Sequence, residues 1–266
     1  MSELSKRTIT ALILAPIVLY TTWIPNPYPF FYLIIFIMTL SWWEIITMKN
    51  FDTPILLALG GWVMFVVNLY LFLTQQFHFL PFFWAITSVI TLVSLFILVE
   101  PERGRRVLNR LLVGMIYLGF LLPFILLLKI SNPSWAILAF LLTWIFDSGS
   151  YFIGKSFGKH AFMPRVSPKK SWEGFLGGLA TVIVSSFVIS PYLGFNSLAL
   201  KLSLALIAAL LATLGDLSES FIKRAYGVKD SSALLPGHGG FLDRIDSLCF
   251  VFLGFYLVYI FGGKFF

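Results

Sequence analysis

The 266-residue chain is 59% hydrophobic and 18% aromatic, with only 12% charged residues and a mean hydropathy of +0.91. This composition excludes an ordinary soluble domain, in which about a quarter of the residues are charged. Apolar runs of about 20 residues recur along the chain, and this is the length at which an α-helix crosses the hydrocarbon core of a bilayer. The sequence therefore predicts an all-α, polytopic integral membrane protein.

The charge balance and the single cysteine exclude several kinds of site. Cys249 alone can form neither an internal disulfide nor a cysteine-rich metal site, and we expect it to be a small buried side chain in an apolar run. The net charge of +7 indicates, in a membrane protein, orientation in the bilayer and attraction to anionic headgroups. We therefore expect the lipid bilayer as a partner and no nucleic acid.

The chain begins with a basic pair, Lys6 and Arg7, followed by an apolar run to Ile24. Signal sequences share this outline, but no small-residue cleavage site follows, so we expect a spanning helix. In chain order the apolar runs predict about nine transmembrane helices, near residues 8–24, 28–48, 54–74, 79–99, 109–130, 134–153, 173–192, 197–219 and 243–263.

Charge is distributed to one side of this predicted topology. With the N-terminus cytoplasmic, every basic residue except Lys129, Lys201 and Lys264 falls on the cytoplasmic side, as the positive-inside rule requires. All 12 acidic residues fall there too, although acids have little influence on topology. We therefore predict a multi-pass protein of the cell (inner) membrane whose chemistry takes place on the cytoplasmic face.

The two halves of the chain differ in polar content. The early helices hold few polar residues apart from Glu44 and Asn68, so we expect residues 1–130 to be a scaffold or an oligomer contact, and a homodimer is left open. Residues 131–266 contain most of the acids and glycines that suit a reaction site, and we expect them to form the catalytic region.

Asp147 ends the sixth predicted helix and is followed by Gly154, Lys155, Gly158 and Lys159. A carboxylate at a membrane boundary is costly unless it is solvated or paired, so Asp147 is either a functional acid or a solvated helix end. The glycines and lysines suit a phosphate group, but they form no fixed pattern.

The segment Ser167–Gly174 predicts the opening of the next helix, with two lysines held at its start. Lysines near a helix N-terminus suit phosphate oxygens, whereas the alternative is a basic rim that snorkels to the membrane surface. The spacing of Gly174 and Gly178 predicts close helix packing. The residues of this segment that we expect to bind substrate are Lys169, Lys170, Ser171 and Glu173.

Two pairs of carboxylates flank the polar connection between the last two predicted helices. Asp216 and Glu219 end one helix three residues apart, and Asp243 and Asp246 repeat this spacing at the start of the next, so each pair shares a helix face. Oxygen ligands without a Cys or His cluster suit a hard cation, most plainly Mg²⁺ shared with substrate phosphates. The alternative is a set of ion pairs with Lys223, Arg224 and Arg244.

A glycine-rich run, Pro236–Gly240, lies between the carboxylate pairs. Its backbone can adopt positive φ and direct amides towards an anion. His238 in this run can donate to a phosphate, move a proton or hydrogen-bond the loop, and spacing alone does not choose among these roles.

The stretch from Ser220 to Asp246 resembles the signature of the phosphatidate cytidylyltransferases, also called CDP-diacylglycerol synthases. This chain reproduces the fixed positions of that signature at Ser220, Lys223, Arg224, Lys229, Asp230, Pro236, His238, Gly239, Gly240, Asp243, Arg244, Ile245 and Asp246, with a small residue at Ser232. The segments 147–159 and 167–174 also resemble the family, whereas the N-terminal half agrees with it only in being polytopic.

The resemblance implies transfer of the cytidylyl group of CTP to phosphatidic acid, giving CDP-diacylglycerol and pyrophosphate, with Mg²⁺ as the cofactor and a second cation left open. It implies catalytic roles for Asp216, Lys223, Arg224, His238, Asp243, Arg244 and Asp246. It implies substrate binding by Asp147, Lys169, Lys170, Ser171, Glu173, Ser220, Lys229, Asp230, Gly239 and Gly240. The expected metal contacts are Asp216 and Asp246 directly, with Glu219 and Asp243 as additional ligands.

Two other functions are compatible with acids in a membrane protein. CTP-dependent lipid-alcohol kinases related to this family need an alcohol acceptor, and the full match from Ser220 to Asp246 favours the cytidylyltransferase instead. A cation or phosphate transporter would place its acids near the middle of the bilayer, whereas these acids all fall on one side.

Overall fold

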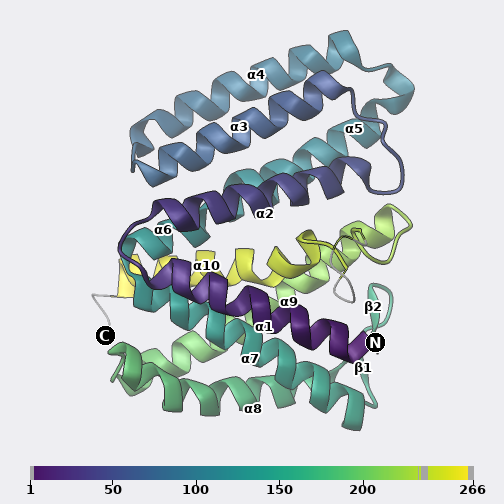
Figure 1. The fold of residues 1–266 in the computed structure, drawn as a ribbon. Helices are drawn as coiled ribbons and strands as arrows, with labels where there is room; N and C mark the ends of the chain where they lie inside the picture. The colour runs from purple at the N-terminus through teal and green to yellow at the C-terminus, as the bar shows by residue number, and fades with distance from the viewer. Residues whose placement is uncertain (1–2, 233, 235–238, 263–266) are drawn as a thin grey trace.

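The protein is a bundle of long helices whose axes run roughly side by side (Figure 1). The computed structural model describes residues 3–232, 234 and 239–262. Eight helices in this part of the chain are long and apolar enough to cross a membrane, and the apolar segment Leu12–Trp23 adds a shorter one. The structure confirms the predicted fold class, an all-α polytopic membrane protein. The helices are α1 Glu3–Trp23, α2 Tyr28–Thr47, α3 Ile55–Leu73, α4 Leu80–Leu98, α5 Pro101–Gly114, α6 Pro123–Ser131, α7 Pro133–Phe157, α8 Trp172–Ile189, α9 Leu198–Ala225 and α10 Leu242–Gly262.

Most predicted spans agree with these helices, but three helices are longer than their apolar runs. The predicted helix 109–130 begins earlier, at Pro101, and consists of α5, a π-helical segment η2 (Met115–Leu121) and α6. Helix α7 continues to Phe157 and α9 to Ala225. These extensions carry charged residues. Charged side chains are costly inside the hydrocarbon core but not outside it, so the helices continue beyond the core. An apolar run marks where a helix meets the membrane boundary and not where it ends.

A short antiparallel hairpin, β1 (Ala161–Met163) and β2 (Ser167–Ser171), lies between α7 and α8. The prediction that a helix opens at Ser167 is therefore wrong, and Lys169 and Lys170 lie on β2 instead. Pro168 biases the residue before it towards extended backbone. Helix α8 begins only after Ser171, whose side chain accepts a hydrogen bond from the Gly174 amide at 3.1 Å.

The helices are arranged in layers (Figure 1). Helices α4 and α3 lie at one side, α2 and α5 follow, and α8 lies at the opposite side. Helix α4 has only one buried residue, Thr87, among the described side chains, so the described chain leaves most of its apolar surface uncovered. The predicted division after residue 130 falls one residue before the end of α6, but α1 packs on α7 and α6 packs on α10. The division therefore stays a prediction about function.

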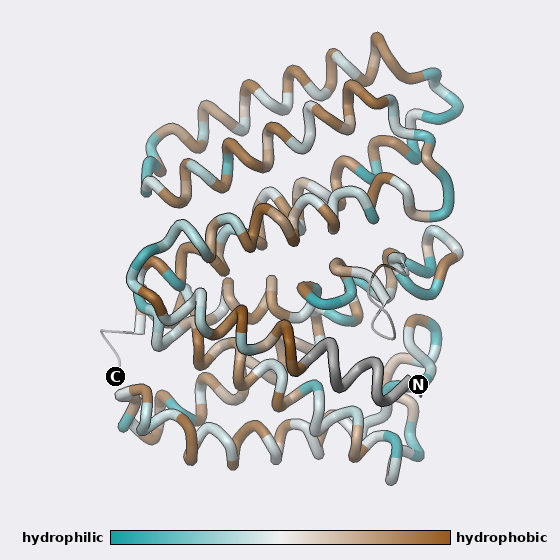
Figure 2. The backbone as a smooth tube through the Cα atoms, viewed as in Figure 1, coloured by the Kyte–Doolittle hydropathy of each residue, from teal (hydrophilic) through white to brown (hydrophobic). Residues whose placement is uncertain are grey.

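The polar connections gather at the two ends of the bundle, and one end receives most of the charged segments (Figure 2). The start of α1, the β1–β2 hairpin and the segment before α10 lie together at this end, which we call the polar end (Figure 1). Helix α10 runs from this end and finishes at the other end of the bundle. The structure thus brings the predicted site segments to one end of the molecule. A cytoplasmic location of the polar end stays a prediction.

Close packing of α7 against α8 depends on small residues. A Cβ at Gly174 would lie 2.9 Å from the Ser150 carbonyl oxygen, and one at Gly178 would lie 3.0 Å from the Phe146 carbonyl oxygen. Both positions face α7, so the predicted packing role of this glycine spacing is confirmed.

Candidate functional site

The first group of side chains at the polar end surrounds Lys223, on the last turns of α9. The Lys223 ammonium contacts Glu219 one turn earlier and Asp243 on the first turn of α10. Lys223 and Glu219 are buried. The Asp243 carboxylate also accepts hydrogen bonds from the Gly240 amide at 2.7 Å and from the amide and hydroxyl of Ser231, at 3.2 and 3.0 Å. We call Glu219, Lys223 and Asp243 the Lys223 cluster.

The Lys223 cluster has the ion pairs that the sequence left open as an alternative to metal binding. Glu219 and Lys223 are four residues apart on one helix, which places their side chains side by side. A buried carboxylate requires a partner of opposite charge or several donors, and Lys223 supplies the charge for two carboxylates. Metal contact by Glu219 and Asp243 stays a prediction.

A second group of acids comes from three helices. Asp147 lies on α7, Asp216 on α9 and Asp246 on α10, and the charges of Asp147 and Asp216 act on Asp246. The charges of Lys170 and Arg244 act on Asp147 from the hairpin and from α10. We call Asp147, Asp216 and Asp246 the aspartate cluster.

The members of the aspartate cluster differ in exposure and partners. Asp216 pairs with Lys170 at 2.6 Å and accepts from the Ser220 hydroxyl at 3.2 Å. Asp147 has no side-chain hydrogen bond or ion pair among the described residues. Asp246 is buried, and its only hydrogen-bond donor among the described residues is the Ser247 amide at 2.7 Å. A buried carboxylate with a single neutral donor is the kind of group that binds a cation or a cationic ligand.

Helices α9 and α10 touch through their backbones beside Asp246. A Cβ at Gly215 would lie 2.8 Å from the Ser247 Cα and 2.9 Å from the Asp246 carbonyl carbon, so only glycine allows this approach. The Ser247 hydroxyl donates to the Ala212 carbonyl oxygen at 3.1 Å and fixes the relative position of the two helices. This contact brings Asp216 of α9 close to Asp246 of α10.

The predicted residues before α8 have structural contacts in this region. Glu173 accepts from the backbone amides of Lys159 and His160, at 3.1 and 3.2 Å, and from Nδ1 of His160 at 2.5 Å. Ser171 caps α8. These contacts hold the chain that leaves α7 against the start of α8. Substrate binding by Glu173 and Ser171 stays a prediction.

The cations at the polar end differ in how many hydrogen bonds and ion pairs they form. Arg224 donates to the carbonyl oxygens of Val166 at 3.4 Å and Val228 at 3.0 Å, and so connects the hairpin to the segment after α9. Four other exposed charged residues of the predicted site have no side-chain hydrogen bond or ion pair within the described chain: Lys169, Lys229, Asp230 and Arg244. Three of these are cations on the surface where a polyanion would bind.

The glycine-rich run is only partly described. Gly239 has a φ of +78°, the positive φ that the sequence predicted for this run. The Gly240 amide donates to Asp243, so it serves the loop itself. His238 and Pro236 lie outside the described residues.

Two residues of the N-terminal half adjoin this site and were not predicted. Glu44, on α2, is buried and bonded to the segment that leads into α10. Tyr117, in η2, is buried, and its hydroxyl has no hydrogen-bond partner among the described residues. The Tyr117 ring lies 6.0 Å from that of Phe250, one helical turn beyond Asp246. A lone acid in an apolar helix is the signal that could have identified Glu44, whereas no sequence signal marked Tyr117.

The donor set of the aspartate cluster fits the Mg²⁺ that the resemblance implies. Its carboxylates are hard oxygen ligands, and Asp246 has no cation partner among the described side chains. In the described parts of the chain, no three acidic, His or Cys side chains already converge as a complete metal site. Mg²⁺ usually takes one or two carboxylates and completes its shell with water and substrate phosphates. The cluster therefore suits a cation held jointly with a phosphate ligand.

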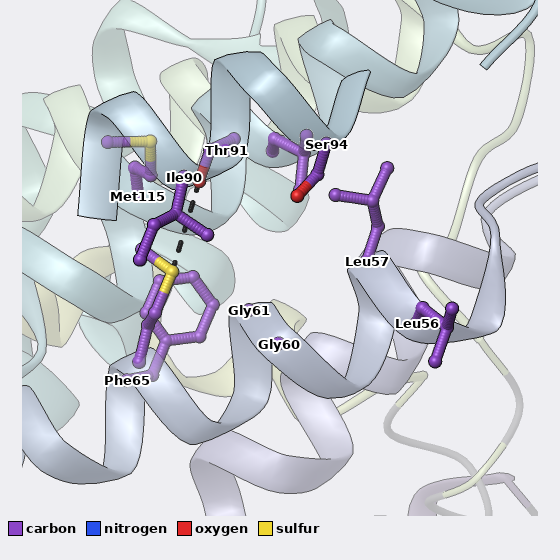
Figure 3. A pocket seen from close by; sticks show the side chains of 11 residues that line it. Leu56, Leu57, Gly60, Gly61, Phe65, Ile90, Thr91, Ser94 and Met115 are labelled. Carbon is purple, nitrogen blue, oxygen red and sulfur yellow. Dashed lines mark hydrogen bonds between the residues drawn. The ribbon is translucent and has the colours of Figure 1, made fainter. Parts of the chain in front are cut away.

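An apolar cavity of about 150 Å³ lies elsewhere, between α3, α4 and the start of η2 (Figure 3). A hydrogen bond from the Thr91 hydroxyl to the Met64 sulfur, 3.9 Å long, crosses it. No charged residue lines this cavity, so it does not suit a nucleotide.

The fold and site define a class of protein: an all-α membrane protein with acids and cations gathered at one end of its bundle. The model of the cytidylyltransferase family matches residues 5–261, and the chain belongs to this family.

Three relatives share the name phosphatidate cytidylyltransferase. The protein of Thermotoga maritima is 40% identical over 167 residues, which cover 60% of this chain and 62% of the relative. That of Haemophilus influenzae is 49% identical over 114 residues, 41% of this chain and 40% of the relative. That of Staphylococcus saprophyticus is 40% identical over 141 residues, 53% of this chain and 54% of the relative. The match thus spans between 40% and 62% of these relatives' lengths.

Proposed function

We propose that the protein transfers the cytidylyl group of CTP to phosphatidic acid at the cytoplasmic boundary of the membrane, giving CDP-diacylglycerol and pyrophosphate. The observation that carries the proposal is the aspartate cluster, which gathers carboxylates of three helices beside Lys170 and Arg244. The names of the relatives and the signature at Ser220–Asp246 support this particular reaction.

The reaction requires charge control more than proton transfer. A phosphate oxygen of phosphatidate forms a bond to the α-phosphorus of CTP, and the bond from that phosphorus to the bridging oxygen of the β-phosphate breaks. Pyrophosphate leaves with the bridging oxygen and its electron pair. Because the attacking oxygen is already an anion, no strong general base is required. The protein must instead align two polyanions and stabilise the charge on the leaving group.

The chain's own residues suit these tasks. Lys170 and Arg244 lie beside the aspartate cluster, and Lys169 is exposed on the same strand as Lys170. These cations would bind phosphate oxygens and reduce the repulsion between the substrates. Arg224 holds the hairpin that carries both lysines against the end of α9. The Lys223 cluster keeps the ends of α9 and α10 in register.

Mg²⁺ bound at Asp246 and Asp216, with Asp147 nearby, would neutralise phosphate charge during the transfer. The carboxylates that bind the cation would thereby keep the bound phosphate close to Lys170 and Arg244. Asp246, because it is buried, would keep its position when substrate binds.

The lipid substrate needs access from the bilayer. A groove of about 470 Å³ lies along α7 and receives Thr181 from α8. Its lining is apolar apart from two hydroxyl residues, and it includes Ser148 and Gly149, which directly follow Asp147 in the sequence. An acyl chain in this groove would place its headgroup near the aspartate cluster, while CTP would arrive from the aqueous side.

Purified protein incubated with labelled CTP and Mg²⁺ tests the proposal, with phosphatidate or a long-chain alcohol as the acceptor. Lipid-linked CMP with released pyrophosphate is the expected result. Phosphorylated alcohol with released CDP would indicate the related kinase activity. Ion flux in liposomes without turnover of CTP would indicate transport. Either of these last two results would contradict the proposal.

A further inference from the structure

Glu44 is a buried acid of α2 whose hydrogen-bond partners, among the described residues, all lie between Ser231 and the first residue of α10. Its Oε1 accepts from the Ser232 hydroxyl at 2.6 Å and from the Phe241 amide at 2.8 Å. Its Oε2 accepts from the Leu242 amide at 2.8 Å and from the Ser231 hydroxyl at 3.0 Å. No Lys, Arg or His among the described residues pairs with it. Three neutral donors, and a fourth that is shared with Asp243, therefore stabilise its charge.

The two amides belong to the start of α10, where backbone N–H groups have no partner within the helix. Such groups are usually capped by a side chain one or two residues before the helix. Here the capping carboxylate comes from another helix, 198 residues before Leu242 in the sequence. A negative charge at a helix N-terminus is also favourable for the helix dipole. Glu44 thus fixes both the position and the rotation of the first turn of α10.

The first turn of α10 carries Asp243 of the Lys223 cluster, and the next turn carries Asp246 of the aspartate cluster. The Ser231 hydroxyl lies 3.0 Å from Glu44 and 3.0 Å from Asp243, and its single proton can be donated to only one of them at a time. Glu44 and Asp243 therefore act on the same loop residue. A shift of Glu44 would move Asp243, the Lys223 cluster and Asp246 together.

Gly240 is required for this arrangement. A Cβ there would lie 2.5 Å from Oε2 of Glu44 and would also overlap the Ser231 hydroxyl. The signature glycine thus leaves room for a carboxylate from the N-terminal half. This contact explains a fixed glycine in the loop without reference to substrate.

The end of α2 is itself held by a buried cation. Arg110 of α5 donates to the carbonyl oxygen of Met48 at 3.1 Å and to that of Asn50, just beyond α2. Its guanidinium lies 5.9 Å from the centre of the Tyr226 ring, which directly follows α9. Burial raises the pKa of the Tyr226 hydroxyl, so the ring stays neutral beneath the cation. Arg110 therefore holds the end of α2, from which Glu44 projects, against the end of α9.

We infer that Glu44 is a positioning residue for the reaction: through Phe241, Leu242 and Ser231 it sets where α10 presents Asp246 to the nucleotide. The inference rests on the proposed function. It also gives the N-terminal half a defined part in the site, beyond that of a scaffold.

Kinetics and hydrogen–deuterium exchange of Glu44→Gln, with Glu44→Ala as the stronger change, test the inference. Gln keeps one acceptor oxygen and presents an NH₂ group to donors, so the first turn of α10 should loosen. We expect the KM for CTP to rise about ten-fold, equivalent to about 1.4 kcal/mol. We also expect faster exchange in peptides that contain Phe241 and Leu242. A merely structural role would lower the active fraction, and hence kcat, without changing KM.

Lys129→Met is the matched control. Lys129 is also buried and also holds a turn, because it donates to the carbonyl oxygens of Pro25 and Asn26 at 3.5 and 3.3 Å, but it lies at the opposite end of the bundle. This variant should lower thermal stability and leave the KM for CTP unchanged. Folded Glu44→Gln with wild-type KM and wild-type exchange at Phe241 and Leu242 would overturn the inference. Wild-type protein without CTP turnover would overturn the proposed function instead, and the exchange comparison would then decide whether Glu44 holds α10.

Discussion

The Lys223 cluster and the aspartate cluster draw on the same two acid pairs but place them in different surroundings. Helix α9 gives Glu219 to the first cluster and Asp216 to the second, and α10 likewise gives Asp243 to the first and Asp246 to the second. Residues three apart on a helix lie about 60° apart around its axis and about 4.5 Å along it. This offset is enough to direct one acid to a buried lysine and the other to the aspartate cluster. Acid spacing alone therefore does not identify a shared metal site.

The largest effect should follow from Asp246→Asn. Because the buried carboxylate has no cation partner among the described side chains, its loss should leave the fold intact and reduce kcat/KM on the order of a thousand-fold. Turnover with labelled CTP and thermal unfolding in detergent measure the two quantities. Glu100→Gln, at an exposed acid that pairs with Arg103, is the control and should change neither. Normal Mg²⁺-dependent turnover of Asp246→Asn would contradict the metal assignment.

In the Lys223 cluster, Lys223→Met should mainly lower the stability of the fold. The change leaves Glu219 and Asp243 without their cation, and breaking a buried pair in this way costs about 3–5 kcal/mol. We expect a large fall in the unfolding midpoint, with partial recovery in the double variant that adds Glu219→Gln. A single variant as stable as the wild type would show that Lys223 serves the substrate and not the fold.

A smaller effect is expected for Lys170→Met, which removes the partner of Asp216. The pair is partly exposed, so its contribution to stability should be below about 1 kcal/mol. Its contribution to phosphate binding should appear as a KM for CTP raised about ten-fold. Lys201→Met, at the opposite end of the bundle, should leave KM unchanged. Equal KM values for both variants would show that Lys170 does not contribute to phosphate binding.

The smallest effect should come from Tyr117→Phe. The Tyr117 hydroxyl is buried without a partner among the described residues, and removing such a group stabilises a protein by up to about 1 kcal/mol. We expect an unfolding midpoint equal to or slightly above that of the wild type. A clear loss of stability would show that the hydroxyl has a partner, and Asp246 would be the first to examine.

Sequence patterns predicted the helices well because the thickness of the bilayer sets the length of each apolar run. They did not predict where α7 and α9 end, since these helices continue past the hydrocarbon core with charged residues. They also missed the β1–β2 hairpin, which consists of a three-residue and a five-residue strand. Strands this short carry no periodic signal.

The candidate site was predicted in part. The signature and the preceding segments contain the residues that the structure brings to the polar end, including Asp147 and Lys170. The division of the acids between two clusters was not predictable, because it depends on which face of α10 meets α9. A lone acid in an apolar helix marked Glu44 as unusual, but its role was not predictable, because it accepts from the Leu242 amide 198 residues away. Contacts between a side chain and a distant backbone leave no pattern in the sequence.

Calorimetric titration of CTP, with and without Mg²⁺, into Asp246→Asn and Glu219→Gln tests most directly whether the two clusters differ in function. Both changes convert one predicted metal ligand to its amide, so they are matched in chemistry. Asp246→Asn should stay folded and lose the Mg²⁺-dependent part of CTP binding. Glu219→Gln should have an altered unfolding midpoint and keep Mg²⁺-dependent binding in its folded fraction. Loss of Mg²⁺ dependence in Glu219→Gln but not in Asp246→Asn would contradict the account.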